Sequence, residues 1–164
     1  MRIPSPALHA WFWLALLGVL AFGACKSPAP AAQPARGSMA EKPRLIAGAT
    51  PVAAFVSEQL LDAENATTIV YVGASWCEPC RRFHQALEDG EYDAALQNVR
   101  FIEYDHDVAG KALVADGYTS KLLPLFAIPR PDGRCSTRSI EGSVKGPSAV
   151  ENLRGRLRAL LVDG

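Results

Sequence analysis

Residues 67–80 read TTIVYVGASWCEPC, and this stretch decides the fold that the sequence predicts. Its first half is apolar and β-branched, which is typical of a strand buried on both faces of a sheet. Cys77 and Cys80 follow directly, and Phe83 and Leu87 then recur at helical spacing. A strand that leads into a helix through a Cys-x-x-C pair predicts an α/β domain with a thiol site at the helix start.

The segments on either side alternate between helix and strand signals. Helices are expected at 50–64, 79–89, 91–97, 111–116 and 148–162, and strands at 67–74, 99–105, 125–128 and 134–141. Thr50 is expected to cap the first helix, with Pro51 at its first position. The turn signal at 131–133 predicts a hairpin between the last two strands. The predicted fold class is therefore α/β, a single domain with a central mixed β-sheet and helices on both faces.

The N-terminal segment predicts export. Residues 10–24 form an uncharged apolar run that follows Arg2, so residues 1–24 are expected to be a signal peptide. An uncleaved membrane anchor is the alternative. The residues before and at Cys25 resemble a bacterial lipobox, except that Phe22 stands where Leu is usual. This resemblance implies that Cys25 is lipidated, whereas ordinary cleavage nearby would leave Cys25 without a role.

A linker is expected between the export segment and the domain. Residues 25–42 are rich in Pro and Ala, and the domain is expected to span 43–164. Loss of residues 1–24 would remove Arg2 and leave 16 basic against 17 acidic side chains. No basic run is present, which argues against nucleic acid as a partner. No dimerisation segment is visible, so a monomer is expected.

The two closely spaced cysteines carry the predicted chemistry. At a helix N-terminus, unpaired N–H groups and the helix dipole favour the thiolate of Cys77. Cys80, one turn later, is close enough for a disulfide. A redox pair is the favoured interpretation, and an inert disulfide is one alternative. A copper or zinc site formed by Cys77, Cys80 and His84 is the other, although structural zinc usually needs a fourth ligand.

Two motifs resemble the thioredoxin superfamily. Residues 76–80, WCEPC, match the WCxPC active site of that family, with Glu78 and Pro79 between the cysteines. Leu123 and Pro124 fall where the family keeps a cis-proline before an antiparallel strand. The resemblance covers about 50–162 and implies a thioredoxin-like domain that needs no cofactor.

The resemblance also implies a role for each site residue. Cys77 would attack a substrate disulfide, and Cys80 would resolve the mixed disulfide. Trp76, the Leu123 backbone and Pro124 would contact the substrate. The implied function is that of an exported thiol–disulfide oxidoreductase, tethered to a membrane and facing the periplasm or cell exterior. Its implied partners are exported protein thiols and disulfides and a redox protein at the membrane, with reduction or exchange as the expected direction.

One position departs from the family. Thioredoxins carry a buried Asp six residues before the first cysteine, where this chain has Tyr71. A phenol is a poor base at neutral pH, so the proton of Cys80 would have to leave through Glu78, Glu103 or water. The simpler interpretation of Glu103 is a strand residue with a solvated carboxylate. Cys135 is left without a pair and is expected to be a small strand residue.

Overall fold

The structure is a computed structural model that describes residues 40–63 and 65–162. The expected signal peptide, Cys25 and most of the expected linker lie outside these residues, and the predictions made for them stay predictions. Within the described part of the chain, no helix combines the length and apolar character needed to cross a membrane.

The described residues form a single α/β domain with four helices and five strands. The elements in chain order are β1 (Arg44–Ala47), α1 (Val52–Leu61), β2 (Thr67–Gly73), α2 (Glu78–Glu88), β3 (Val99–Asp105), α3 (His106–Ala115), β4 (Leu125–Pro129), β5 (Cys135–Glu141) and α4 (Ala149–Val162). The predicted fold class is confirmed, and the strand predicted at 99–105 has the predicted bounds.

The sheet has the strand order β1-β3-β2-β4-β5. β1, β3 and β2 are parallel, whereas β4 pairs antiparallel with β2, and β5 pairs antiparallel with β4. Tyr71 on β2 is the register partner of Glu103 on β3 and of Phe126 on β4. The central position of β2 explains why its residues from Thr68 to Gly73 are all buried.

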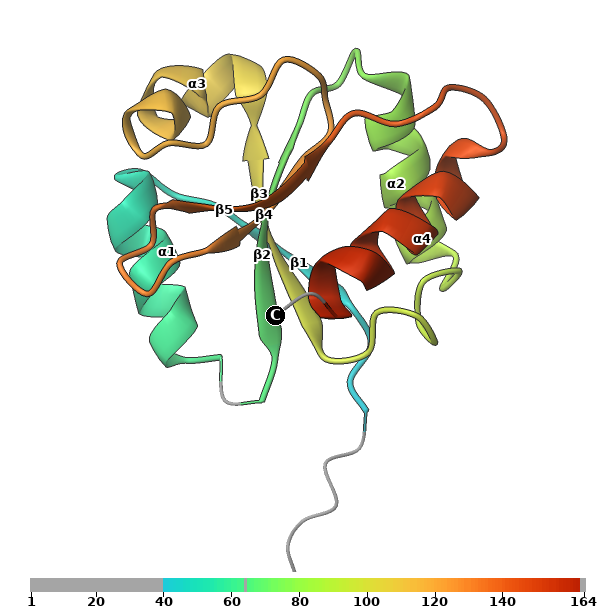
Figure 1. Ribbon diagram of the computed structural model, residues 1–164, viewed down its shortest axis with the longest axis horizontal. Coiled ribbons are helices and arrows are strands. Elements are labelled where there is room, and N and C mark those ends of the chain that lie inside the picture. Colours follow the sequence, from blue (N-terminus) through green and yellow to red (C-terminus); the bar gives the residue numbers. More distant parts are fainter. Residues whose placement is uncertain (1–39, 64, 163–164) are drawn as a thin grey trace, which may run out of the picture. The chain divides into compact units, whose positions relative to one another are not determined.

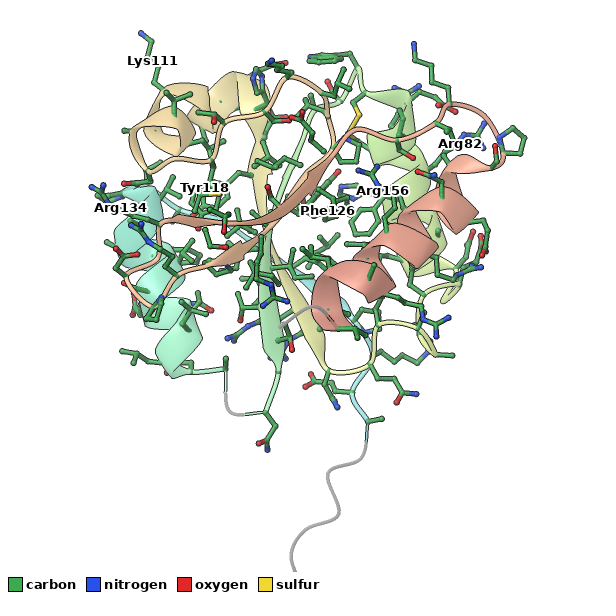
Figure 2. All side chains as sticks on the ribbon, viewed as in Figure 1. Arg82, Lys111, Tyr118, Phe126, Arg134 and Arg156 are labelled. Carbon is green, nitrogen blue, oxygen red and sulfur yellow. A yellow bond between two sulfur atoms is a disulfide. The ribbon has the colours of Figure 1, made fainter. Side chains whose placement is uncertain are left out.

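Each face of the sheet packs on a different pair of helices. α1 and α3 lie on one side of the sheet and α2 and α4 on the other, as Figure 1 shows with the sheet nearly edge-on. Side chains of β2 alternate between the two cores, with Ile69 and Tyr71 toward α2, and Val70 and Val72 toward α1. Phe126 points from β4 into the space between the sheet and α4 (Figure 2).

The hairpin of β4 and β5 packs back onto α1. Gly133 in its turn has a φ of +77°, and a Cβ atom there would overlap the carbonyl oxygen of Ala53. Tyr118 donates a hydrogen bond of 2.7 Å to the Gly133 carbonyl, and Figure 2 shows Tyr118 on this side of the sheet. Asp116 accepts a hydrogen bond of 2.9 Å from the Ala53 N–H. The first turn of α1 is thus capped by a residue far away in the sequence.

Several predicted element boundaries were wrong. Thr50 does not cap α1. Pro51 occupies the N-cap position, and its side chain cannot accept a hydrogen bond from the helix. The segment 91–97 forms successive turns and no helix among the described residues. Its helical spacing arose because Tyr92 and Leu96 are both fully buried. α3 begins five residues before the predicted 111, directly after β3.

The strand β1 was missed by the sequence analysis. It has only four residues, and its side chains are exposed or half-buried. A pattern this short carries little periodicity, so pairing with β3 at the edge of the sheet defines the strand.

Candidate active site

The candidate site lies where the parallel strands β2 and β3 end. The N-terminus of α2 follows β2, and the N-terminus of α3 follows β3, so both helices begin at the same edge of the sheet. The segment before β4 and the segment after β5 reach the same edge. Crevices at the carboxyl ends of parallel strands are frequent ligand sites in α/β proteins.

Cys77 and Cys80 are joined by a disulfide, with their Cα atoms 5.2 Å apart. Cys77 is the N-cap residue of α2, and its Sγ accepts a hydrogen bond of 3.3 Å from the Cys80 N–H. Once the pair is reduced, the same N–H and the helix dipole would stabilise a thiolate on Cys77. Pro79 lies in the first turn, where its missing N–H removes no helical hydrogen bond.

The two sulfur atoms have different surroundings, although both residues are almost fully buried. Cys77 lines a groove of about 400 Å³, here named the Cys77 groove. Cys80 lines a separate cavity of about 460 Å³, here named the Cys80 cavity. The groove is lined among others by Trp76, Cys77, Pro79, Leu122, Leu123 and Gly142. The cavity is lined among others by Tyr71, Gly73, Cys80, Arg81, His84 and Glu103.

The Cys77 groove has an apolar rim. Trp76 is 62% exposed, and its indole N–H donates a hydrogen bond of 2.8 Å to Asp107 on α3. This bond holds the ring in one orientation and helps to lower the pKa of Asp107, which His106 lowers more strongly. Leu122 across the groove is also 62% exposed. Large exposed apolar side chains beside a reactive group mark a contact surface for a partner.

The segment before β4 presents free backbone groups. The Leu123–Pro124 peptide bond is cis, as the resemblance implied. The Pro124 carbonyl accepts a hydrogen bond of 2.8 Å from the Gly142 N–H. Among the described residues, neither the N–H nor the C=O of Leu123 has a hydrogen-bond partner. Leu123 therefore keeps the pairing capacity that an extended peptide would use.

Glu78 lies on the groove side of the cysteine pair. Its carboxylate forms an ion pair with Arg82 and accepts a hydrogen bond of 3.2 Å from the Gly146 N–H. The bond from Arg82 is the main cause of the lowered pKa of Glu78. These contacts fasten the segment after β5 to α2. Since Glu78 lines the groove and not the cavity of Cys80, it is poorly placed to receive the Cys80 proton.

Tyr71, which stands where thioredoxins carry a buried Asp, is fully buried. Burial raises the pKa of the Tyr71 hydroxyl far above its ordinary value, with smaller contributions from Glu103 and Asp105. The hydroxyl is therefore neutral at any physiological pH. It has no hydrogen-bond partner among the described residues. Gly73 makes room for it, because a Cβ atom at Gly73 would overlap the Tyr71 hydroxyl.

His84 and Glu103 form a hydrogen-bonded pair in the Cys80 cavity. The imidazole Nε2 of His84 lies 2.7 Å from Oε1 of Glu103, and both side chains are about one-third exposed. The imidazole ring also packs on Tyr71, with 5.6 Å between ring centroids. The Glu103 hydrogen bond raises the pKa of His84, and burial opposes this effect. Glu103 is the strand residue that was expected, and its partly exposed carboxylate is in addition bonded to His84.

The alternative metal site at Cys77, Cys80 and His84 is not assembled in this disulfide-bonded form. Within the described ranges, no group of three or more His, Cys, Asp or Glu side chains is arranged to hold a metal ion. The two cysteines of the alternative site are bonded to each other, and His84 is engaged with Glu103.

Cys135 lies away from the candidate site. It is a half-buried residue at the start of β5 and is not bonded to another described cysteine. Burial raises the pKa of its thiol, which keeps it in the unreactive protonated form.

The chain matches no protein-family model, and no curated protein matches it significantly. The candidate site therefore has to be interpreted from its own residues and geometry. The sequence placed His84 near Cys80, but it gave no signal that Tyr71 and Glu103 line the same cavity. The hydrogen bond between the Gly146 N–H and the Glu78 carboxylate was missed as well.

Proposed function

We propose that this protein is a thiol–disulfide oxidoreductase of the thioredoxin superfamily that reduces or exchanges disulfides of other proteins. The observation that carries the proposal is the disulfide between Cys77 and Cys80 at the start of α2, beside an open groove with unpaired backbone groups at Leu123. An inert disulfide would need neither the groove nor a capping position that favours a thiolate.

The reaction would proceed in two exchanges. In the reduced protein, the Cys77 thiolate attacks one sulfur of a substrate disulfide, and the other substrate sulfur leaves as a thiolate that gains a proton. Cys80 then loses its proton and attacks Cys77 Sγ, which releases the second substrate thiol. The products are the Cys77–Cys80 disulfide and a substrate dithiol. Two electrons and two protons have passed to the substrate.

Substrate binding is supported by the Cys77 groove. An extended substrate segment could pair with the free N–H and C=O of Leu123 while its disulfide lies against Cys77. Trp76 and Leu122 would supply apolar contact on the two sides of the groove. These contacts depend on backbone and apolar area and not on charge, so they would accept many substrate sequences.

Export and tethering are part of the proposal. The N-terminal segment favours a lipidated Cys25 on a membrane facing the periplasm or cell exterior, where a redox protein at the membrane would renew the dithiol. The mass of the mature N-terminal peptide tests this part separately. A mature chain that begins at Cys25 and carries acyl groups is expected, and an unmodified mature N-terminus would contradict it.

The test of the activity uses three matched Cys→Ser variants. Cys77→Ser is expected to abolish reduction of a protein disulfide, because no other described thiol has a capping N–H and an adjacent groove. Cys80→Ser is expected to retain attack and to accumulate a mixed disulfide at Cys77, identified by peptide mapping. Cys135→Ser is the control and should keep wild-type turnover. Normal turnover in Cys77→Ser would overturn the proposal.

A further inference from the structure

The buried position of Cys80 raises a question that the exchange chemistry does not answer. In the second exchange the Cys80 thiol must lose a proton before its sulfur attacks Cys77, and burial disfavours the thiolate. Cys80 is only 2% exposed, so its thiol has little direct contact with bulk water. The Cys80 cavity is the space next to this thiol, and the groups that line it decide where the proton can go.

His84 is the group in this cavity best suited to accept a proton. It lies four residues after Cys80 on α2, and residues at that spacing share one face of a helix. Its Nε2 is hydrogen-bonded to Oε1 of Glu103, at 2.7 Å. In the neutral ring Nε2 then carries the hydrogen, which leaves Nδ1 as the free acceptor. Glu103 fixes this tautomer and stabilises the imidazolium that forms.

The Tyr71 hydroxyl is an independent indication that the cavity holds water. It is fully buried, lines the cavity and has no partner among the described residues. Buried hydroxyl groups nearly always have a hydrogen-bond partner, and ordered water often supplies it. The cavity has polar groups from several elements among its lining, has room for water, and reaches the protein surface. Water bonded to Tyr71 would lie among the hydroxyl, Cys80 and His84.

The following inference rests on the proposed function. We propose that His84, oriented by Glu103, accepts the proton of the Cys80 thiol through water held by the Tyr71 hydroxyl. When Cys80 attacks, its S–H bond breaks and the proton moves over water to Nδ1 of His84. The Cys80–Cys77 bond forms, and the bond between Cys77 and the substrate sulfur breaks. The imidazolium then gives its proton to solvent, while the departing substrate thiolate takes one up. The charge of the cavity is then the same as before the exchange.

The charges around His84 set the pH at which this step works. Glu103 on β3 and Glu88 on α2 both raise the pKa of His84, and burial against the sheet lowers it. Arg81, from α2, also lines the cavity, as does Asp105 at the end of β3. Tyr71 stays neutral. Resolution is therefore expected to accelerate as pH rises through the pKa of His84, above the ordinary value of 6.5.

The experiment follows the second exchange alone. The reduced full chain is mixed with a small aromatic disulfide, quenched with acid at intervals, and analysed for the mixed disulfide at Cys77 by mass spectrometry and peptide mapping. Because Cys77 is already bonded in that species, its decay reports only the attack by Cys80. The decay rate is measured across the pH range for each variant.

His84→Gln is expected to slow the decay by about a hundredfold, the lower end of what general acid–base catalysis contributes. It should also remove the inflection from the pH profile. Glu103→Gln should move the inflection to lower pH, since the main cause of the raised pKa of His84 is lost. Tyr71→Phe should slow the decay without moving the inflection. A purely structural role for these side chains would not produce this pattern.

Glu58→Gln is the control, because Glu58 is an exposed carboxylate on α1, on the opposite face of the sheet. It should leave the decay rate and its pH profile unchanged. Wild-type decay with an unchanged inflection in both His84→Gln and Glu103→Gln would overturn this inference while leaving the oxidoreductase proposal intact. If no mixed disulfide forms at Cys77 in Cys80→Ser, where no resolving thiol is present, the proposed function fails instead. Should His84→Gln not fold, the shift in Glu103→Gln decides the question.

Discussion

The two sides of the Cys77–Cys80 disulfide differ in what holds them in place. The Cys77 groove is formed by chain segments outside the strands, with Trp76 and Leu122 largely exposed. The Cys80 cavity lies over an aromatic core and is lined by ionisable side chains from β2, β3 and α2. The groove therefore offers an exposed surface to a partner, whereas the cavity is backed by the core of the domain. In the proposed reaction, this motif of five residues would serve two physically different tasks.

The largest expected effect is a loss of stability on the buried side of the disulfide. Phe83 of α2 is fully buried, and its ring lies 4.9 Å from the rings of both Tyr71 and Phe126. Phe83→Ala is expected to lower the free energy of unfolding by about 3–5 kcal/mol, because a cavity replaces the ring. Urea denaturation measures this loss.

Leu122→Ala is the matched truncation on the groove side. Leu122 is 62% exposed, so the free energy of unfolding should change by no more than about 0.5 kcal/mol. Its effect should appear in a slower reaction with protein disulfides and not with a small disulfide. Equal losses of stability in Phe83→Ala and Leu122→Ala would contradict the contrast between a buried and an exposed side.

A smaller effect is expected from a single methyl group in the Cys80 cavity. In Gly73→Ala the new Cβ atom would overlap the Tyr71 hydroxyl, and the strand and ring would have to shift. Overpacking of this kind typically costs about 1–3 kcal/mol, which a shift in the denaturation midpoint would report.

Gly155→Ala in α4 is the control, and its free energy of unfolding is expected to change in the opposite direction. A Cβ atom at Gly155 meets no described atom within 4 Å. Alanine in a helix interior is favoured over glycine by about 1 kcal/mol, so this variant should be more stable than wild type. A neutral result for Gly73→Ala would show that the space around Tyr71 is less confined than the structure indicates.

The smallest expected effect is a pH dependence of stability. The pKa of His84 in the folded chain is raised chiefly by its hydrogen bond with Glu103. A raised pKa stabilises the folded state fully below the ordinary value of 6.5, and this contribution disappears as pH rises through the folded-state pKa. The stability advantage of wild type over His84→Gln should therefore shrink as pH rises above 6.5. An advantage that grows with pH would have the wrong sign.

Much of this fold follows from local sequence signals. The apolar run of β2, the amphipathic pattern of α4 and the turn at Gly133 each predict their element without reference to the rest of the chain. The cysteine pair at the start of α2 was equally visible, because a motif within five residues fixes its own geometry. β1 was not visible, since four residues carry too little periodicity and β3 supplies its pairing.

The sequence by itself determined the α/β class, the order of most elements and the capping position of Cys77, because these depend on neighbours within a few residues. Only the tertiary structure decided what surrounds Cys80. Tyr71, His84 and Glu103 come from three different elements, and the register between β2 and β3 together with the packing of α2 brings them to one cavity. Contacts between residues distant along the chain leave no periodic trace in the sequence, so their chemistry emerges only once the chain has folded.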